Sequence, residues 1–282
     1  MYVIAHRVND AEKLRMALAG RANALEIDVT INEQFGVLAW HGTHFADWNS
    51  ARLDRHLDAI AEACRSTAGR NICLLIIDFK YDPPNFRTPT LPRNRPIGPN
   101  DVNEVRSMVR QRVLNRVNGV ARWGRGIYAL YCMSSASEGI IESAIGQTGW
   151  GLLHHEGLNY DAAAYSPALR RTPAQALAWV QRQTFVPSFM YSTGVAPGGP
   201  AGQVKAMRDR IRRNNLNPST PRLSSYAWTF NRAANSASWL QAGDLDGIMG
   251  NMRRNFRHVT TLGDYGLART LYTRQSRPPF LR

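Results

Sequence analysis

Cysteine is scarce in this chain, with only three among 282 residues. So small and odd a number excludes a disulfide framework, and no cysteine or histidine spacing resembles a zinc site. We expect Cys64, Cys73 and Cys132 to be buried free thiols. Long apolar runs are missing too. The clearest one, at 72–77, is far shorter than the ~20 residues that a membrane-spanning helix needs.

No glycine-rich phosphate loop follows the first predicted strand, which argues against a dinucleotide-binding doubly wound sheet. Acidic residues are also few, 21 against 35 basic ones, and the formal net charge is +14. This excess implies an anionic partner or surface: nucleic acid, acidic lipid headgroups or an anionic bulk phase. Because no nucleic-acid-binding motif is present, we expect no specific nucleic-acid partner.

Strand-like and helical segments alternate along most of the chain. We predict strands at 2–5, 25–30, 72–77, 127–131, 151–154, 186–191, 224–230 and 245–250, and helices at 11–19, 50–66, 101–117, 137–147, 173–183, 201–214 and 235–242. Eight parallel strands separated by helices are typical of a (β/α)₈ TIM barrel, with a doubly wound sheet as the alternative. We therefore expect one α/β domain over residues 1–282, with long loops at 81–100 and 194–202.

The second predicted strand carries two carboxylates on one face. Its apolar residues alternate with Glu26 and Asp28, so the two acids point the same way. Two neighbouring carboxylates inside a protein ionise together at low cost only if a cation lies between them. An all-oxygen pair suits Mg²⁺. The alternative is a solvent-facing edge strand with two ordinary acids.

A short polar turn joins this strand to an antiparallel partner at 35–40, which forms a β-hairpin extension of the barrel. A turn centred after Glu33 places His41 opposite Glu26. In the same register Ala39 lies opposite Asp28. Directly opposed side chains share a face of the sheet, so this register predicts that His41 lies beside the carboxylates.

Further polar residues stand at the ends of predicted strands, where barrels of this kind carry their catalytic groups. His6 ends the first strand, Asp78 and Lys80 follow the third, and Trp228 lies near the end of the seventh. Each has an ordinary alternative: a structural histidine, a surface ion pair or a core tryptophan. Three more polar residues end the predicted fifth strand, and we favour a structural or supporting role for them: His154, His155 and Glu156.

Six short motifs follow one another along nearly the whole chain. They are Ile4-Ala5-His6-x-Val8-Asn9, Glu26-Ile27-Asp28, His41-Gly42-Thr43, Asp78-Phe79-Lys80, Tyr226-x-Trp228-Thr229 and Asp246-Gly247-Ile248-Met249. Together they resemble the sphingomyelinase D / phospholipase D family of spider venoms and bacteria, which is related to the glycerophosphodiester phosphodiesterases. Glycine after His41 favours the sphingomyelinase D branch. Venom enzymes brace the next loop with a disulfide, whereas residues 44–48 contain no cysteine.

This resemblance implies that three carboxylates hold one Mg²⁺ ion and that two histidines form the acid–base pair: Glu26, Asp28 and Asp78, with His6 and His41. Lys80 would contact the phosphate, and Trp228 would form a wall near a choline headgroup. Relatives are thought to let a hydroxyl of the substrate attack the phosphorus, which implies a cyclic product. The C-terminal tail, about 263–282, loosely resembles a segment that closes the bottom of the barrel.

Three functions therefore remain open at this point. The first is a Mg²⁺-dependent phospholipase D that removes choline or a similar headgroup from sphingomyelin or lysophospholipids at a membrane surface. The second is a glycerophosphodiesterase that acts on soluble headgroup diesters. The third is an inactive barrel that binds lipid or nucleic acid. The first residues lead directly into a strand without a signal peptide, so the protein is either cytosolic or has lost a leader. We expect a secreted monomer.

Overall fold

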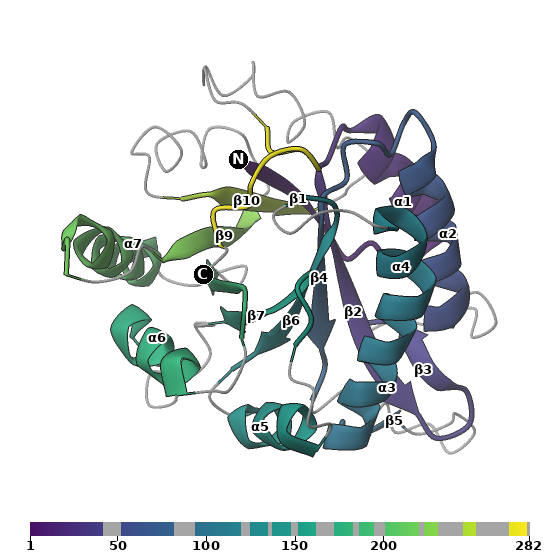
Figure 1. Cartoon of the computed structure of the whole chain (residues 1–282), viewed down its shortest axis with the longest axis horizontal. Helices are drawn as coiled ribbons and strands as arrows, with labels where there is room; N and C mark the ends of the chain where they lie inside the picture. Colours follow the sequence, from purple (N-terminus) through teal and green to yellow (C-terminus); the bar gives the residue numbers. More distant parts are fainter. Residues whose placement is uncertain are drawn as a thin grey trace.

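The fold is seen in a computed structural model that describes residues 1–41, 52–81, 94–119, 125–134, 137–147, 152–161, 172–182, 186–194, 201–219, 223–230, 245–251 and 271–280. Its centre is a closed barrel of eight parallel strands (Figure 1). The strands are β1 (Tyr2–His6), β2 (Ala24–Asn32), β4 (Leu74–Phe79), β6 (Tyr128–Met133), β7 (Glu156–Asp161), β8 (Phe189–Gly194), β9 (Ser224–Phe230) and β10 (Gly247–Asn251). Pairing of β1 with both β10 and β2 closes the barrel, which confirms the predicted TIM-barrel class.

Helices follow the strands and cover the outside of the barrel (Figure 1). They are α1 (Ala11–Ala19), α2 (Leu53–Arg65), α3 (Pro99–Val109), the π-helical turn η1 (Arg110–Leu114), α4 (Asn115–Asn118), α5 (Glu138–Gln147), α6 (Pro173–Arg182) and α7 (Ala201–Leu216). The predicted helix at 235–242 lies outside the described residues. Among those described, no helix has the length and apolar character needed to cross a membrane.

Period-two alternation along the strands divides the core into two layers. One apolar cluster fills the space between the barrel and its helices, and it includes Leu25, Ile27 and Val29 of β2. A smaller cluster lies inside the barrel, and it includes Ile4, Ala24, Ile76 and Leu130. Glu26 and Asp28 lie two and four residues after Ala24 on the same strand, so their side chains also point into the barrel. The two acids of β2 thus face the interior and not solvent, which removes the edge-strand alternative.

Strand β2 continues beyond the barrel and forms a small antiparallel unit with β3 (Gly36–Ala39) and β5 (Asn94–Arg95). The hairpin register differs by one residue from the predicted one, because Val29 and not Asp28 lies opposite Ala39. The turn has an odd number of residues: the Asn32 side-chain oxygen accepts from the two backbone N–H groups after Glu33, and Gly36 adopts a left-handed φ of 75°. His41 therefore cannot lie opposite Glu26.

The fifth barrel strand also differs from the sequence-based prediction. A strand at 151–154 is wrong, since β7 spans Glu156–Asp161. The charge of Glu156 suggests a strand end in the sequence, yet this residue opens the strand and is buried. As a result, His154 and His155 precede β7 at the end of the barrel that holds the N-termini of the strands. That end lies opposite the C-terminal ends of β1, β2 and β4.

Residues 271–280, which we call the C-terminal strap, lie across the N-terminal ends of the strands. The Tyr272 backbone N–H donates to Met1 O at 3.1 Å, and Phe189 N–H donates to Phe280 O at 3.1 Å. The Phe280 ring packs against Tyr2 and Tyr128, with centroids 5.8 and 5.5 Å away. The strap thereby packs against the apolar interior of the barrel at this end.

Candidate active site

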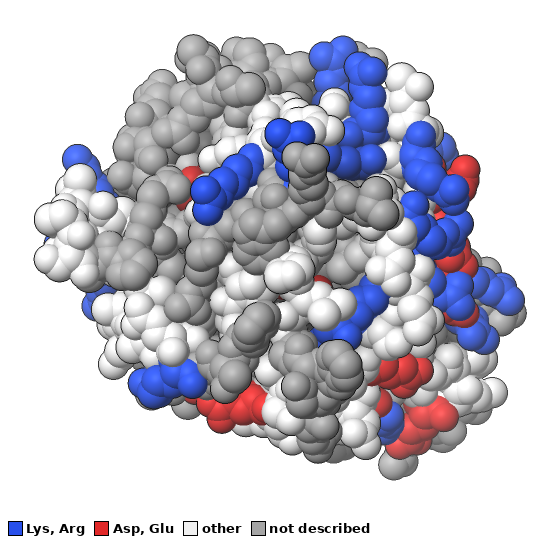
Figure 2. Space-filling model, viewed as in Figure 1, with Lys and Arg blue, Asp and Glu red and all other residues white. Residues whose placement is uncertain are grey.

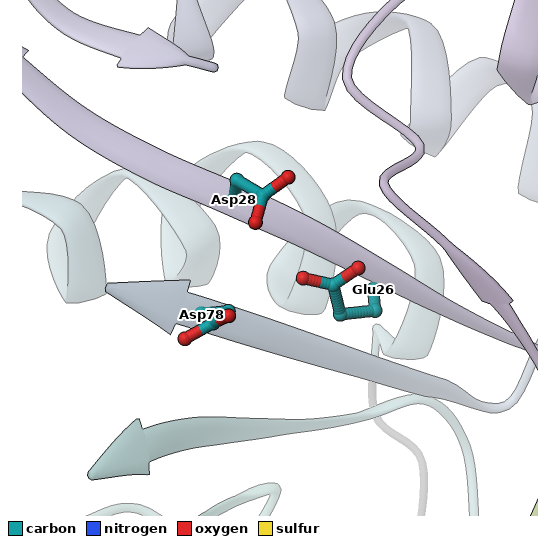
Figure 3. Close-up of side chains that lie close together, drawn as sticks. All are labelled: Glu26, Asp28 and Asp78. Carbon is teal, nitrogen blue, oxygen red and sulfur yellow. The ribbon is translucent and has the colours of Figure 1, made fainter. Parts of the chain in front are cut away.

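Three carboxylates converge inside the barrel from two neighbouring strands (Figure 3). Glu26 and Asp28 come from β2, and Asp78 comes from β4, where it is the direct register partner of Asp28. Paired residues of neighbouring parallel strands put their side chains on the same face. One carboxylate oxygen from each of the three lies within 4.8 Å of the others. This cluster is the one that the sequence predicts as a metal site.

Two side chains hold this cluster in place. The Asn9 amide donates to Asp28 Oδ2 at 2.7 Å, and its oxygen accepts from the Asp28 backbone N–H at 3.0 Å. The Lys80 ammonium lies 2.7 Å from Asp28 Oδ1 and also contacts Asp78. The lysine therefore bridges two of the three carboxylates.

The electrostatics of the cluster are uneven. Burial together with the charges of Asp28 and Asp78 raises the pKa of Glu26 well above its usual value. Burial also raises the pKa of Asp78. For Asp28, burial acts in the same direction, but the Lys80 charge outweighs it and lowers the pKa. Lys80 loses solvation by burial, yet the three carboxylates raise its pKa well above the ordinary value.

A metal ion fits these residues on two grounds. Three carboxylates and one ammonium leave a formal charge of −2, which a divalent cation would balance. In addition, Glu26 Oε1 is buried and has no hydrogen-bond partner among the residues that the structure describes. A buried carboxylate oxygen without a partner is costly, and coordination to a cation would satisfy it. Glu26, Asp28 and Asp78 can thus hold a metal ion, and an all-oxygen set favours a hard cation such as Mg²⁺.

The two predicted catalytic histidines flank the carboxylates. His6 ends β1, and its Nε2 lies 3.9 Å from Glu26 Oε2. His41 lies just beyond β3, and its Nε2 lies 2.5 Å from Nη2 of Arg7. Strand β3 ends at Ala39, before His41, so the hairpin register does not fix where this histidine lies. The structure therefore brings His41 to the site even though the expected register is wrong. Gly42, Thr43 and the loop at 44–48 lie outside the described residues.

Arg7 follows His6 in the chain and contacts His41, and it is a residue that the sequence reasoning does not single out. It adopts a left-handed φ of 57° directly after β1, which is uncommon for a residue with a side chain. Its backbone N–H donates to Glu26 Oε2 at 2.6 Å. A guanidinium can only donate, so His41 Nε2 accepts and carries no proton in this arrangement. Burial lowers the pKa of His41 to about 4, with Lys80 and Arg7 acting in the same direction.

Asp161, at the end of β7, is a second residue that sequence reasoning misses. Its Oδ1 accepts from the Trp228 indole and from the Ser192 hydroxyl, both at 3.1 Å. Burial, followed by the charge of Asp78, raises the pKa of Asp161 to about 7. Trp228 is thereby placed at the same end of the barrel as the carboxylates. A correct boundary for β7 would reveal Asp161 as another acid at a strand end.

Glu156, by contrast, belongs to the outer layer of the barrel. Its carboxylate accepts from Arg110 Nε at 2.8 Å and Nη2 at 2.5 Å, from the Tyr131 hydroxyl at 2.8 Å and from the Leu153 N–H at 2.8 Å. Such a fully partnered buried acid ties β7 to η1. His155 donates through Nε2 to the Arg125 carbonyl oxygen at 2.7 Å, at the opposite end of the barrel from the carboxylates. Both residues therefore have structural contacts and lie away from the site.

Comparison with known proteins gives the class of this barrel. Residues 1–138 match the family model described as Sphingomyelinase D/Phospholipase D. A solved structure described as a glycerophosphoryl diester phosphodiesterase from Silicibacter pomeroyi DSS-3 is 16% identical, with a TM-score of 0.52, over 95% of this chain and 94% of that one. Another, a glycerophosphodiester phosphodiesterase from Agrobacterium tumefaciens str. C58, is 14% identical, with a TM-score of 0.45, over 90% of this chain and 97% of that one. No curated protein sequence matches the chain.

The family match confirms the resemblance drawn from the sequence. Residues 1–138, just under half of the chain, match the sphingomyelinase D/phospholipase D family model, and this range contains β1, β2 and β4 with all three carboxylates and both histidines. At 16% identity, the likeness to the Silicibacter pomeroyi structure shows the barrel fold alone. The protein is thus a TIM barrel whose N-terminal residues match the Sphingomyelinase D/Phospholipase D family model.

Proposed function

We propose that the protein is a Mg²⁺-dependent phospholipase D that removes choline or a similar headgroup from sphingomyelin or lysophospholipids. One observation carries this proposal. Three carboxylates, the Lys80 ammonium and the two histidines lie together at the C-terminal ends of β1, β2 and β4. Breaking a phosphodiester needs positive charge at the non-bridging oxygens, a base for the attacking oxygen and an acid for the departing one.

The residues divide these tasks among them. Glu26, Asp28 and Asp78 would hold the metal ion, which supplies positive charge to the phosphate when bound. Lys80 would add a second positive charge beside it. His6 and His41 would exchange protons with the attacking and leaving oxygens.

Trp228 has the character expected for headgroup recognition. Its ring is only partly buried, and its indole N–H is fixed by Asp161. A cationic headgroup placed over this ring would gain a cation–π contact. The nearby Asp161 carboxylate would favour the same positive charge when ionised.

We further propose that the attacking oxygen belongs to the substrate. A hydroxyl a few bonds from the phosphorus has a high effective concentration and can outcompete water. The P–O bond to the headgroup breaks as the bond to this hydroxyl forms, one histidine takes the hydroxyl proton, and the other gives a proton to the departing choline oxygen. The lipid product would then be a cyclic phosphate.

Phosphorus NMR of the reaction mixture tests this proposal. Sphingomyelin or lysophosphatidylcholine vesicles with Mg²⁺ should release choline and give a cyclic diester signal at the earliest times. The Asp28→Asn variant is the matched control and should release none. A monoester with no earlier cyclic species would refute the intramolecular route.

The alternative is a glycerophosphodiesterase with the same carboxylates and histidines, acting on soluble diesters. Turnover of glycerophosphocholine without turnover of either vesicle would favour it. No turnover of any diester by the Mg²⁺-loaded protein would favour a barrel that only binds its partner.

A further inference from the structure

Four of the described helices begin with an acidic residue. The helices run antiparallel to the strands, so they begin at the end that carries the carboxylate site. Acidic residues occupy the first turns of α1, α2, α3 and α5: Glu12, Asp54, Asp101 and Glu138. Acids at helix N-termini are favourable because they complement the helix dipole. Arginines stand at the other end.

Five exposed arginines lie on the C-terminal strap or in segments near it, at that other end of the barrel. We call them the arginine face: Arg21, Arg65, Arg70, Arg125 and Arg277. Arg182, Arg212 and Arg213, which are also exposed, lie at the C-terminal ends of α6 and α7 on the same end of the barrel. Figure 2 shows Lys and Arg atoms at the upper right and along the right side, where Figure 1 places α1, α2 and α4.

Hydrogen bonds to the strap hold the neighbouring segments that carry these arginines at one end of the barrel. The Arg274 guanidinium donates to the carbonyl oxygens of Cys64, Gly69 and Ile72 at 2.7, 3.0 and 2.8 Å. This anchors the segment that contains Arg65 and Arg70.

The segments that carry Arg125 and Arg21 are anchored to the strap in the same way. The Gly126 N–H, next to Arg125, donates to the Arg274 carbonyl oxygen at 2.8 Å. The Asn23 amide, two residues after Arg21, donates to the Tyr272 carbonyl oxygen at 2.8 Å.

Most of the arginine face is not neutralised by acids. Arg65 pairs with Glu62 at 3.1 Å. In the part of the chain that the structure describes, the other four have no ion pair with an acidic side chain. Guanidinium groups are weakly hydrated and bind phosphate oxygens in a bidentate manner. A surface that bears several phosphates would therefore complement this face.

Two exposed leucines distinguish between phosphate-bearing partners. Leu153 and Leu216 are the exposed large hydrophobic residues of the described chain, at 44% and 71% exposure. Leu153 precedes β7, and Leu216 ends α7, so both stand at the same end of the barrel as the arginines. Apolar side chains among arginines suit the interface of an anionic bilayer, where the leucines contact acyl chains. Nucleic acid would gain little from them.

We propose that this end of the barrel docks on an anionic lipid bilayer, with the arginine face on the headgroups and the two leucines inserted beside it. Docking in this way points the carboxylate site away from the bilayer. The substrate would then arrive from solution or from a second, facing membrane. This docking is separate from the proposed function, because it uses none of the residues placed in the catalytic site.

A triple variant tests the arginine face. Arg70→Gln, Arg125→Gln and Arg277→Gln together remove three positive charges without breaking an ion pair. Sedimentation with vesicles of phosphatidylcholine and phosphatidylserine should show a partition coefficient lower by on the order of 100-fold. The control removes three exposed arginines outside the face, Arg15→Gln, Arg52→Gln and Arg55→Gln, of which Arg52 pairs with Asp54 at 3.1 Å. It should weaken binding far less, and an equal loss in both variants would overturn the proposal.

The orientation is tested with a polarity-sensitive dye at Leu216→Cys. The native cysteines should not compete for the label, because all three are buried, which raises the pKa of Cys64 to about 11 and that of Cys73 to about 12. Emission should shift to the blue on anionic vesicles, and a dye at Ser107→Cys on α3 should not respond.

The opposite dye pattern would overturn the proposal. So would a triple variant that loses double-stranded DNA binding but keeps its affinity for vesicles. Choline release is not part of either measurement, so the docking and the proposed activity can fail separately.

Discussion

Replacing Lys80 with Met should destabilise the metal-free protein at neutral pH. The lysine ammonium lies 2.7 Å from Asp28 Oδ1, and the side chains of the lysine and the aspartate are 21% and 0% exposed. Methionine keeps most of the apolar stem but removes the charge, which leaves three carboxylates without the cation that bridges two of them. The perturbation is therefore almost purely electrostatic.

The size of the effect follows from the burial of the pair. Removing one partner of a buried ion pair costs about 3–5 kcal/mol. The contact with Asp78 adds little, because the Asp78 side chain is 35% exposed and water screens the charge. We expect the free energy of unfolding at pH 7 to fall by about 3 kcal/mol, the low end of that range.

The pH dependence identifies the cause. Lys80 lowers the pKa of Asp28, so the ion pair stabilises the folded parent at pH values above the pKa of Asp28 in the unfolded chain. This stabilisation is lost as the pH falls through the lower pKa that Asp28 has in the folded state. In the variant this contribution is missing. The already raised pKa values of Glu26 and Asp78 rise further, because Lys80 lowers both in the parent. The gap between variant and parent should therefore shrink from pH 7 toward pH 4, as the carboxylates take up protons.

Urea unfolding in the presence of a chelator measures this gap. Lys13→Met is the control, because Lys13 forms an exposed pair with Asp10 at 3.6 Å and should change stability by less than about 1 kcal/mol. Added Mg²⁺ should stabilise the Lys80 variant more than the parent, since its site carries one more negative charge. A Lys80→Met protein as stable as the parent at pH 7 would refute the reasoning.

Other changes give separate tests. Asp28→Asn should abolish Mg²⁺ binding by isothermal titration while the far-ultraviolet circular dichroism stays that of the parent; binding as tight as the parent's would contradict the metal site. His6→Ala and His41→Ala should each lower turnover of the phosphodiester by about 10²–10⁴-fold, and near-normal turnover would remove that histidine from the mechanism. Glu156→Gln should lower the free energy of unfolding by about 3–5 kcal/mol, because Arg110 loses its buried partner, but leave turnover per folded molecule unchanged. A large loss of turnover in the folded Glu156 variant would show that this residue reaches the site.

Much of the site follows from the sequence because strand periodicity is local. The alternation around Glu26 and Asp28 fixes that both point to one face, whatever the rest of the chain does. Asp78 and Lys80 follow another predicted strand. A barrel places the end of that strand next to the parallel strand that carries Glu26 and Asp28, which brings the third carboxylate to the same site. Apolar runs are also sufficient to locate seven of the eight barrel strands approximately. These features depend on the next few residues along the chain.

What the sequence leaves undecided depends on contacts between distant segments. The start of β7 is set by Arg110 and Tyr131, which neutralise and bury Glu156; without them its charge looks like a strand end. That boundary in turn decides that Asp161, and not His154, lies at the site end of the barrel.

The hairpin and the turn after β1 show the same limit. A turn one residue longer than expected changes the register of β3, so the approach of His41 depends on where the chain goes after that strand. Only tertiary structure puts the Arg7 guanidinium against His41 Nε2, since the two are 34 residues apart and no local pattern relates them. The sequence by itself determines which faces carry the carboxylates. Packing decides which histidine, arginine and additional aspartate meet them, because these contacts form only when strands distant in the chain close into one barrel.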